Sequence, residues 1–124
     1  GPTITLEIAD DFDAHKPALV QLRLRVNEWT DPDAVQVTWD AQQLASPQID
    51  YCSLANPSPA GGAFLAPPRW RDIGEVSSAV WLTWDLTDSG VTRGEHAVGI
   101  AVRERNPLVG AALTLTDVEL VVRY

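Results

Sequence analysis

The chain has almost no cysteine and no long apolar run, and these absences exclude several classes of protein. Its 124 residues contain one cysteine, Cys52, which has no partner for an internal disulfide. No apolar stretch approaches the roughly 18 residues needed to cross a bilayer. Positive charge is also scarce, since nine Lys and Arg face seventeen Asp and Glu for a formal net charge of −8. This charge repels phosphate backbones and anionic lipids, so neither nucleic acid nor a membrane is an expected partner.

Signatures of catalysis are missing as well. The two histidines, His15 and His96, do not have the spacing of metal ligands with each other or with cysteine. No serine lies in a GxSxG elbow, and no glycine-rich loop precedes a helix. The carboxylate pair Asp31 and Asp33 is explained by a turn. We therefore expect a protein that is not an enzyme and has no organic cofactor.

What the chain does have is a two-residue period of apolar side chains. In ALVQLRLRVNEW, apolar residues alternate with Gln, Arg and Asn, which is typical of a half-buried strand. Turn sequences rich in Pro, Gly, Asp and Asn separate such segments. Many short strands with breakers between them indicate an all-β antiparallel sandwich of seven to eight strands. The predicted strands cover residues 3–9, 18–29, 34–40, 48–54, 79–86, 95–104 and 112–124.

Domain organisation is simple, because there is no repeat and no linker of low complexity. Residues 3–124 are expected to form one β-sandwich domain, excised from a larger protein. Gly1-Pro2 resembles the remnant that a protease leaves after removing an affinity tag. Residues 10–19 predict at most one turn of helix, capped by aspartate and limited by Pro17.

A long irregular segment, residues 55–75, exceeds what a connection between strands requires, and such loops are usually functional or mobile. It holds Trp70 between Arg69 and Arg71. Three interpretations of Trp70 stay open: it caps the core, it stacks on a sugar, or it contacts a neighbouring domain.

Strand parity gives a condition under which several loop residues meet. If residues 48–54 are the fourth antiparallel strand, the connections 28–34, 55–75 and 104–111 emerge at one end. The residues that then share a rim are Trp29, Arg69, Trp70, Arg71, Arg105 and Asn106. A separate strand at 42–44, running back, would reverse the parity and separate them.

The order of these strands carries a resemblance. It lies in five segments: ITLEIADDFDA, VQLRLRVNEWTDPDAVQVTWDAQQL, VWLTWDL, TRGEHAVGIAVRERNP and LTLTDVELVVRY. These segments resemble the galactose-binding-domain-like β-sandwich. Among its members they resemble the small jelly-roll domains at the C-terminal end of bacterial glycoside-hydrolase-like proteins. The similarity runs over nearly the whole chain. It implies a jelly roll and a non-catalytic role, either as a carbohydrate-binding module or as a domain packed on a catalytic one. It also implies a secreted or cell-surface protein.

Two local features bear on this resemblance. Members often follow the third strand with an Asn-Gly hairpin, whereas Asp40-Ala41 occupies that position here. Alanine tolerates the positive φ of a type I′ turn poorly, so we expect a turn of another type. Sandwiches of this kind often hold structural calcium, for which Asp10, Asp11 and Asp13 are the candidate ligands. The alternative, which we favour, is an exposed acidic turn with Phe12 packed inward.

Tryptophan supplies the functional hypothesis, because five indoles in 124 residues are well above ordinary usage. Indole stacks on the C–H face of a sugar ring, and hydroxyl groups need carboxylates, amides and guanidinium groups nearby. By alternation Trp39 and Trp84 belong to the core, while Trp81 faces the other way and suits either core or a sheet-face platform. The residues expected to bind carbohydrate are Trp70, Arg69, Arg71, Trp29, Asp50 and Asn106. The alternative function is a structural domain that stabilises a neighbouring catalytic domain without binding sugar.

Overall fold

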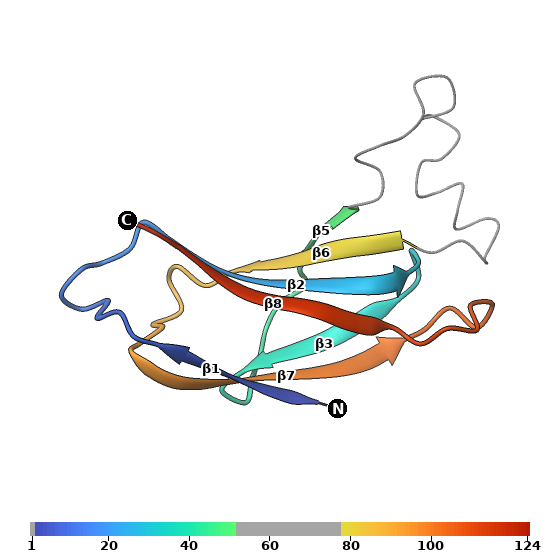
Figure 1. Cartoon of the computed structure of the whole chain (residues 1–124), viewed down its shortest axis with the longest axis horizontal. Helices are drawn as coiled ribbons and strands as arrows, with labels where there is room; N and C mark the ends of the chain where they lie inside the picture. Colours follow the sequence, from blue (N-terminus) through green and yellow to red (C-terminus); the bar gives the residue numbers. More distant parts are fainter. Residues whose placement is uncertain (1, 52–77) are drawn as a thin grey trace, which may run out of the picture.

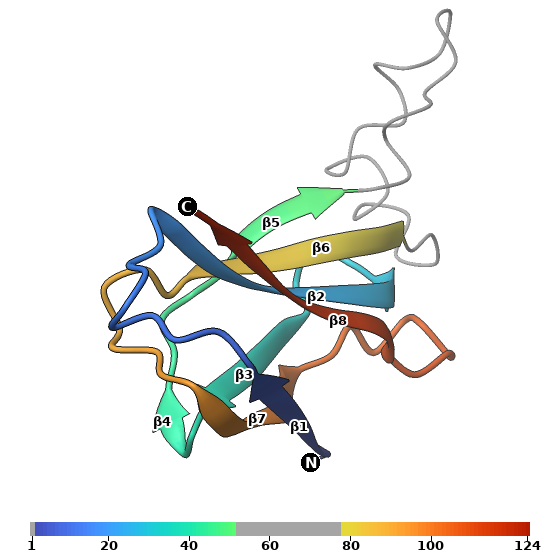
Figure 2. The same cartoon turned by 60° about the vertical axis from the view of Figure 1, so that its left-hand side comes forward.

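The computed structural model describes residues 2–51 and 78–124 (Figures 1 and 2). The described residues form eight strands and no helix, and so no helical membrane span. The strands lie in two antiparallel sheets of four, with orders β1-β7-β3-β4 and β5-β6-β2-β8. The predicted all-β sandwich is therefore confirmed. The strands are β1 (Thr3–Ile8), β2 (Leu19–Trp29), β3 (Ala34–Trp39), β4 (Gln42–Gln43), β5 (Gln48–Tyr51), β6 (Ser78–Asp85), β7 (Gly94–Glu104) and β8 (Thr114–Arg123).

Alternation in the long strands assigns the two faces of each sheet. In β2, Val20, Leu22 and Leu24 are at most 1% exposed, whereas Arg23 and Arg25 on the opposite face are half-buried. Strand β6 turns Val80, Leu82 and Trp84 to the same interior, as their parity predicts. Burying each such aliphatic side chain contributes about 1.5–3 kcal/mol relative to exposure, so the alternation fixes which face is inside.

The chain crosses from one sheet to the other between β4 and β5, and this crossing explains why β5 still ends at the expected end of the sandwich. β4 does form, as a partner of β3, and the chain then crosses to the other sheet, where β5 pairs with β6. β4 and β5 run in the same direction, so the crossing involves no reversal. Tyr51 and Ser78, which border the undescribed segment, therefore lie at the end of the sandwich where β2 finishes at Trp29. The expectation that a strand at 42–44 reverses the parity is wrong for this reason.

The β3–β4 hairpin also corrects the sequence-based expectation for its turn. Trp39 pairs with Gln42, and the two residues between them, Asp40 and Ala41, have φ angles of 48° and 68°. Positive φ at both central positions defines a type I′ turn. The turn tolerates alanine because Asp40 is anchored elsewhere: its amide donates to the Ala97 carbonyl at 2.8 Å, and its Oδ1 accepts from the Ala97 amide at 2.9 Å.

The acidic segment between β1 and β2 forms a short capped turn. Oδ1 of Asp11 accepts hydrogen bonds from the amides of Asp13 and Ala14, at 3.0 and 3.2 Å. The amide of His15 donates to the Asp11 carbonyl at 3.0 Å. Phe12 is 8% exposed and packs into the core, as the acidic-turn interpretation requires.

Candidate functional site

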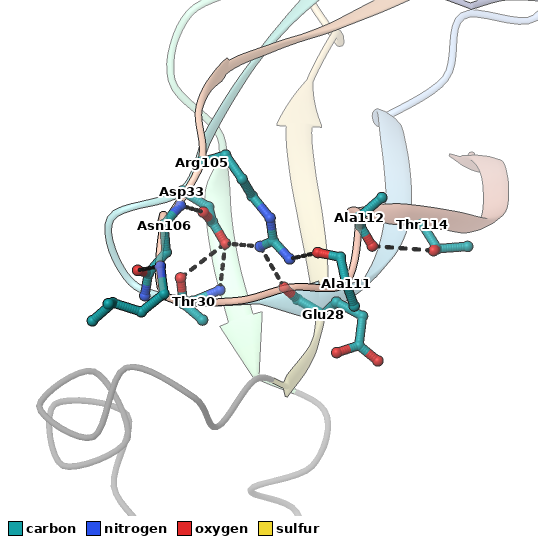
Figure 3. Close-up of polar contacts among 9 residues, drawn as sticks. Glu28, Thr30, Asp33, Arg105, Asn106, Ala111, Ala112 and Thr114 are labelled. Carbon is teal, nitrogen blue, oxygen red and sulfur yellow. Dashed lines mark hydrogen bonds and ion pairs between the residues drawn. The ribbon is translucent and has the colours of Figure 1, made fainter.

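A dense polar cluster surrounds Asp33 at the end of the sandwich where β2 and β7 finish (Figure 3). The Asp33 side chain is fully buried. Its Oδ2 accepts from the amide and hydroxyl of Thr30, at 2.6 and 2.9 Å, and pairs with Nη1 of Arg105 at 2.5 Å. Its Oδ1 accepts from the Asn106 amide at 2.6 Å. Both carboxylate oxygens are thus engaged within the protein, which suits a structural group.

The guanidinium of Arg105 extends the same cluster. Its Nη1 also donates to the Glu28 carbonyl at 2.6 Å, and Nη2 donates to the Ala111 carbonyl (Figure 3). Glu28 has a φ of 65°, and the β2–β6 register shifts between Val26 and Trp29. Arg105 therefore fastens an irregular strand end to the β7–β8 connection, and the two connections meet as strand parity predicted.

The residues predicted to bind sugar at this rim divide into three groups. Trp29 is 2% exposed and belongs to the core, so its indole offers no free face to a sugar. Asn106 is 5% exposed, and its Oδ1 accepts from the Leu108 amide at 3.0 Å, which makes it a turn residue. Trp70, Arg69 and Arg71 lie outside the described residues.

Asp50, the remaining predicted residue, lies on a different surface, the outer face of the β5-β6-β2-β8 sheet. There it stands directly opposite Trp81 of β6, which in turn stands opposite Arg25 of β2. Arg25 faces Asp117 of β8. Four strands thus contribute one straight row across the sheet, which we call the Trp81 row and define as Asp50, Trp81, Arg25 and Asp117.

Groups in and beside the Trp81 row differ in how firmly they are bound. The guanidinium carbon of Arg23 lies 4.3 Å from the centre of the Trp81 ring, and Nη1 of Arg23 bonds Oε1 of Glu119 at 2.7 Å. Arg25 is held loosely, since its Nη1 is 4.0 Å from Oδ2 of Asp117. No hydrogen bond from a described residue engages the carboxylate of Asp50, which is exposed. The row therefore keeps both a hydrogen-bond acceptor and a donor beside an indole.

Sequence reasoning left the role of Trp81 open and did not find Arg25. The alternation in RLRVN and AVWLTWDL does place both side chains on outer faces. Their meeting depends on the register between β2, β5 and β6, which no local pattern specifies. Only the paired strands place Asp50, 31 residues earlier in the chain than Trp81, next to that indole.

A second titratable cluster joins the β3–β4 turn to β7. Nδ1 of His96 lies 2.6 Å from Oδ2 of Asp40, and Nε2 lies 2.6 Å from the Thr92 carbonyl. Both partners accept hydrogen bonds only, so the geometry requires a proton on each ring nitrogen. Burial by itself lowers the pKa of His96, but the bonds to Asp40 and Thr92 outweigh it and raise that pKa above its usual value. The ring also stacks on Trp39, with centroids 4.9 Å apart.

The bond to His96, followed by that to the Ala97 amide, lowers the pKa of Asp40. Both shifts therefore favour the charged pair, in which His96 is protonated and Asp40 is ionised. The His96 ring is 7% exposed and enclosed by the turn and by Trp39, so the cluster stabilises the hairpin and offers little access to a substrate.

The candidate calcium ligands are engaged separately. Asp11 caps its own turn, and Oδ2 of Asp10 accepts from the Tyr124 hydroxyl at 2.8 Å. Residues 2–51 and 78–124 contain no group of three or more His, Cys, Asp or Glu placed to hold a metal. The calcium hypothesis gains no support from this arrangement and stays a prediction.

One further hollow lies between the two sheets where the chain crosses from β4 to β5. It has a volume of about 360 Å³ and is lined by residues that include Trp29, Gln43, Leu44 and Arg103. Comparison with family models, curated proteins and solved structures finds no match for this chain.

Proposed function

We propose that this protein is a non-catalytic carbohydrate-binding domain and that the sugar binds on the Trp81 row. The observation that carries the proposal is the register that puts Asp50 and Arg25 on either side of one outward-facing indole. The resemblance to galactose-binding-like jelly rolls supports the same function. It further implies that the domain is appended to a bacterial glycoside hydrolase.

The chemistry of the row matches the needs of a pyranose ring. An indole face covers the apolar C–H side of the sugar, a carboxylate accepts from hydroxyl groups, and a guanidinium donates to hydroxyl and ring oxygens. Asp50 and Arg25 are separated by two strand spacings, about 10 Å, with Trp81 between them, so a sugar stacked on the indole has one polar side chain on each side. Arg23 contacts one face of the Trp81 ring, so the sugar uses the opposite face, on the side of Ala79.

Charge limits the class of sugar. The Trp81 row with its neighbours Arg23 and Glu119 holds two arginines and three carboxylates, and the whole chain has a formal net charge of −8. This balance disfavours polyanions such as sulfated polysaccharides. We expect neutral oligosaccharides and polysaccharides to bind.

The test is affinity electrophoresis and calorimetry of the domain against a panel of neutral and acidic polysaccharides. Removing the platform in Trp81→Ala should abolish binding, because stacking supplies most of the contact. Asp50→Asn, at an exposed side chain, should weaken binding about three- to ten-fold with unchanged stability, since one charged hydrogen bond becomes neutral. Tyr124→Ala is the matched control, because that exposed aromatic lies away from the row.

Other outcomes have definite meanings. Retained binding in Trp81→Ala with loss in Trp70→Ala would move the sugar site to the long connection. Absence of binding to every glycan by the unaltered domain would refute the carbohydrate function.

A second candidate, an accessory domain packed on a catalytic domain, is favoured by one observation. Leu108 is 66% exposed and Val102 is 55% exposed, both toward the end of the sandwich where β7 finishes. Exposed apolar side chains of this size mark an interface when they lie together. If no glycan binds, co-purification of the domain with its catalytic neighbour, lost on Leu108→Ser, would establish this function instead.

A further inference from the structure

The edges of the two sheets are protected unequally. Edge strands expose unpaired backbone groups, and proteins usually keep such strands short. Among the described strands, three of the four edges follow this rule, since β1 has six residues, β4 two and β5 four. β8 has ten residues, contains neither proline nor glycine, and is the last strand of its sheet (Figure 2). Within the described chain it pairs with β2 alone.

The regular part of this edge has a definite centre. From Asp117 to Arg123, β8 stays in unbroken register with β2, and the register shifts only beyond Arg25. A straight edge of seven residues, centred on Leu120, is therefore available. Its inward side chains, Val118, Leu120 and Val122, are only half-buried.

The geometry points to a second copy of this chain as the partner of that edge, paired antiparallel about a two-fold axis at Leu120. In this register Asp117 of each copy stands opposite Arg123 of the other, and Val118 stands opposite Val122. Both charged residues are exposed. Asp117 lies 4.0 Å from Arg25 and accepts a hydrogen bond from the Thr116 hydroxyl at 3.1 Å, so it has no close ion pair of its own. Opposite charges and apolar pairs directly across strands stabilise such a pairing.

Neighbouring registers fit less well. A two-fold axis at Glu119 would place that carboxylate opposite its own copy, which is destabilising. An axis at Val121 would place Glu119 opposite Arg123, but Glu119 is already bonded to Arg23 at 2.7 Å. The register centred on Leu120 is the one that uses the whole regular segment and the less engaged carboxylate.

Pairing in this way joins two sheets of four strands into one continuous sheet. Because the two-fold axis is perpendicular to the sheet, both outer faces look in the same direction. If the sugar site on the Trp81 row is correct, the dimer presents two such rows to one polymer and gains avidity. The pairing itself does not depend on the sugar site.

The experiment is sedimentation equilibrium of the whole chain over a range of concentrations at moderate salt, which screens the repulsion between two acidic copies. The unaltered chain should form a dimer. Asp117→Arg and Arg123→Asp should each weaken it about ten-fold or more, since each places like charges opposite at two symmetric positions. The double variant should restore it. Glu104→Arg, at an exposed carboxylate on β7 of the other sheet, is the control.

Hydrogen exchange gives an independent readout that does not need a variant to fold. Raising the protein concentration should increase protection of amides in residues 117–123 and leave β1 unchanged. A chain that stays monomeric throughout, a dimer unaffected by both single charge reversals, or a double variant that fails to recover would each overturn the proposal.

Discussion

The pair formed by His96 and Asp40 makes the stability of this domain depend on pH in a definite direction. The His96 ring is nearly buried and faces two acceptors, the Asp40 carboxylate and the Thr92 carbonyl. Its pKa in the folded protein lies above the ordinary value of 6.5. The resulting stabilisation is fully present below the unfolded-state pKa and is lost as pH rises through the folded-state pKa. The pKa of Asp40 is lowered below 3.8, so its contribution is lost only as pH falls through that lower value.

The magnitude follows from the hydrogen bonds. Deprotonation removes one of two bonds made by a charged ring and leaves a nitrogen lone pair facing an oxygen. A hydrogen bond to a charged group contributes about 1.5–3 kcal/mol, so we expect a loss of roughly 2 kcal/mol at alkaline pH. For a chain of this size that is a fall in Tm of about 5–10 °C.

The assay is urea unfolding at a series of pH values from about 5.5 to 9, for the unaltered protein and for His96→Gln, which does not titrate. The difference in free energy of unfolding between the two should shrink as pH rises. Proton NMR of the ring should show His96 titrating above the ordinary value of 6.5. A free-energy difference that is constant or grows with pH would refute the reasoning.

Two further predictions concern backbone strain and the buried carboxylate. Ala41→Gly should stabilise the domain by about 0.5–1 kcal/mol in urea unfolding, because the φ of 68° at Ala41 is unfavourable for an L-residue. The control, Ala45→Gly, is at an alanine without positive φ and should destabilise the domain. Destabilisation by Ala41→Gly would contradict the turn assignment. Asp33→Asn should lower the free energy of unfolding by about 3–5 kcal/mol, because it leaves the Arg105 charge without its partner and turns an amide N–H toward donors. Asp13→Asn, at an exposed position, should shift the unfolding midpoint little. Equal effects of the two variants would show that the Asp33 cluster is not structural.

Much of the fold was predictable because it depends on local alternation. Val20, Leu22 and Leu24 are inside and Arg23 is outside, as their two-residue period indicated. Antiparallel connectivity also brought the β2–β3 and β7–β8 connections to one end. The turn at Asp40-Ala41 was predicted wrongly, because the bonds that hold Asp40 come from Ala97, 57 residues further along the chain.

The candidate site was predictable only in part. Asp50 was identified as a polar group on an alternating strand, but the indole beside it is Trp81 and not Trp29. Trp29 stands at the end of β2, where the register with β6 shifts, and its ring lies in the core. A turn-rich sequence such as NEWTDPD does not reveal such a shift.

The sequence by itself determined the class of fold, the face to which the regularly alternating strand residues point, and the formal net charge of −8. These properties follow from the period of the side chains and from the sum of charges, which need no knowledge of neighbours. Only the tertiary structure decided that Asp50, Trp81 and Arg25 form one row, that Asp33 and Arg105 fasten two connections, and that β8 pairs with β2 alone among the described strands. Register between strands and order within a sheet depend on how the whole core packs, so no segment of the chain carries that information alone.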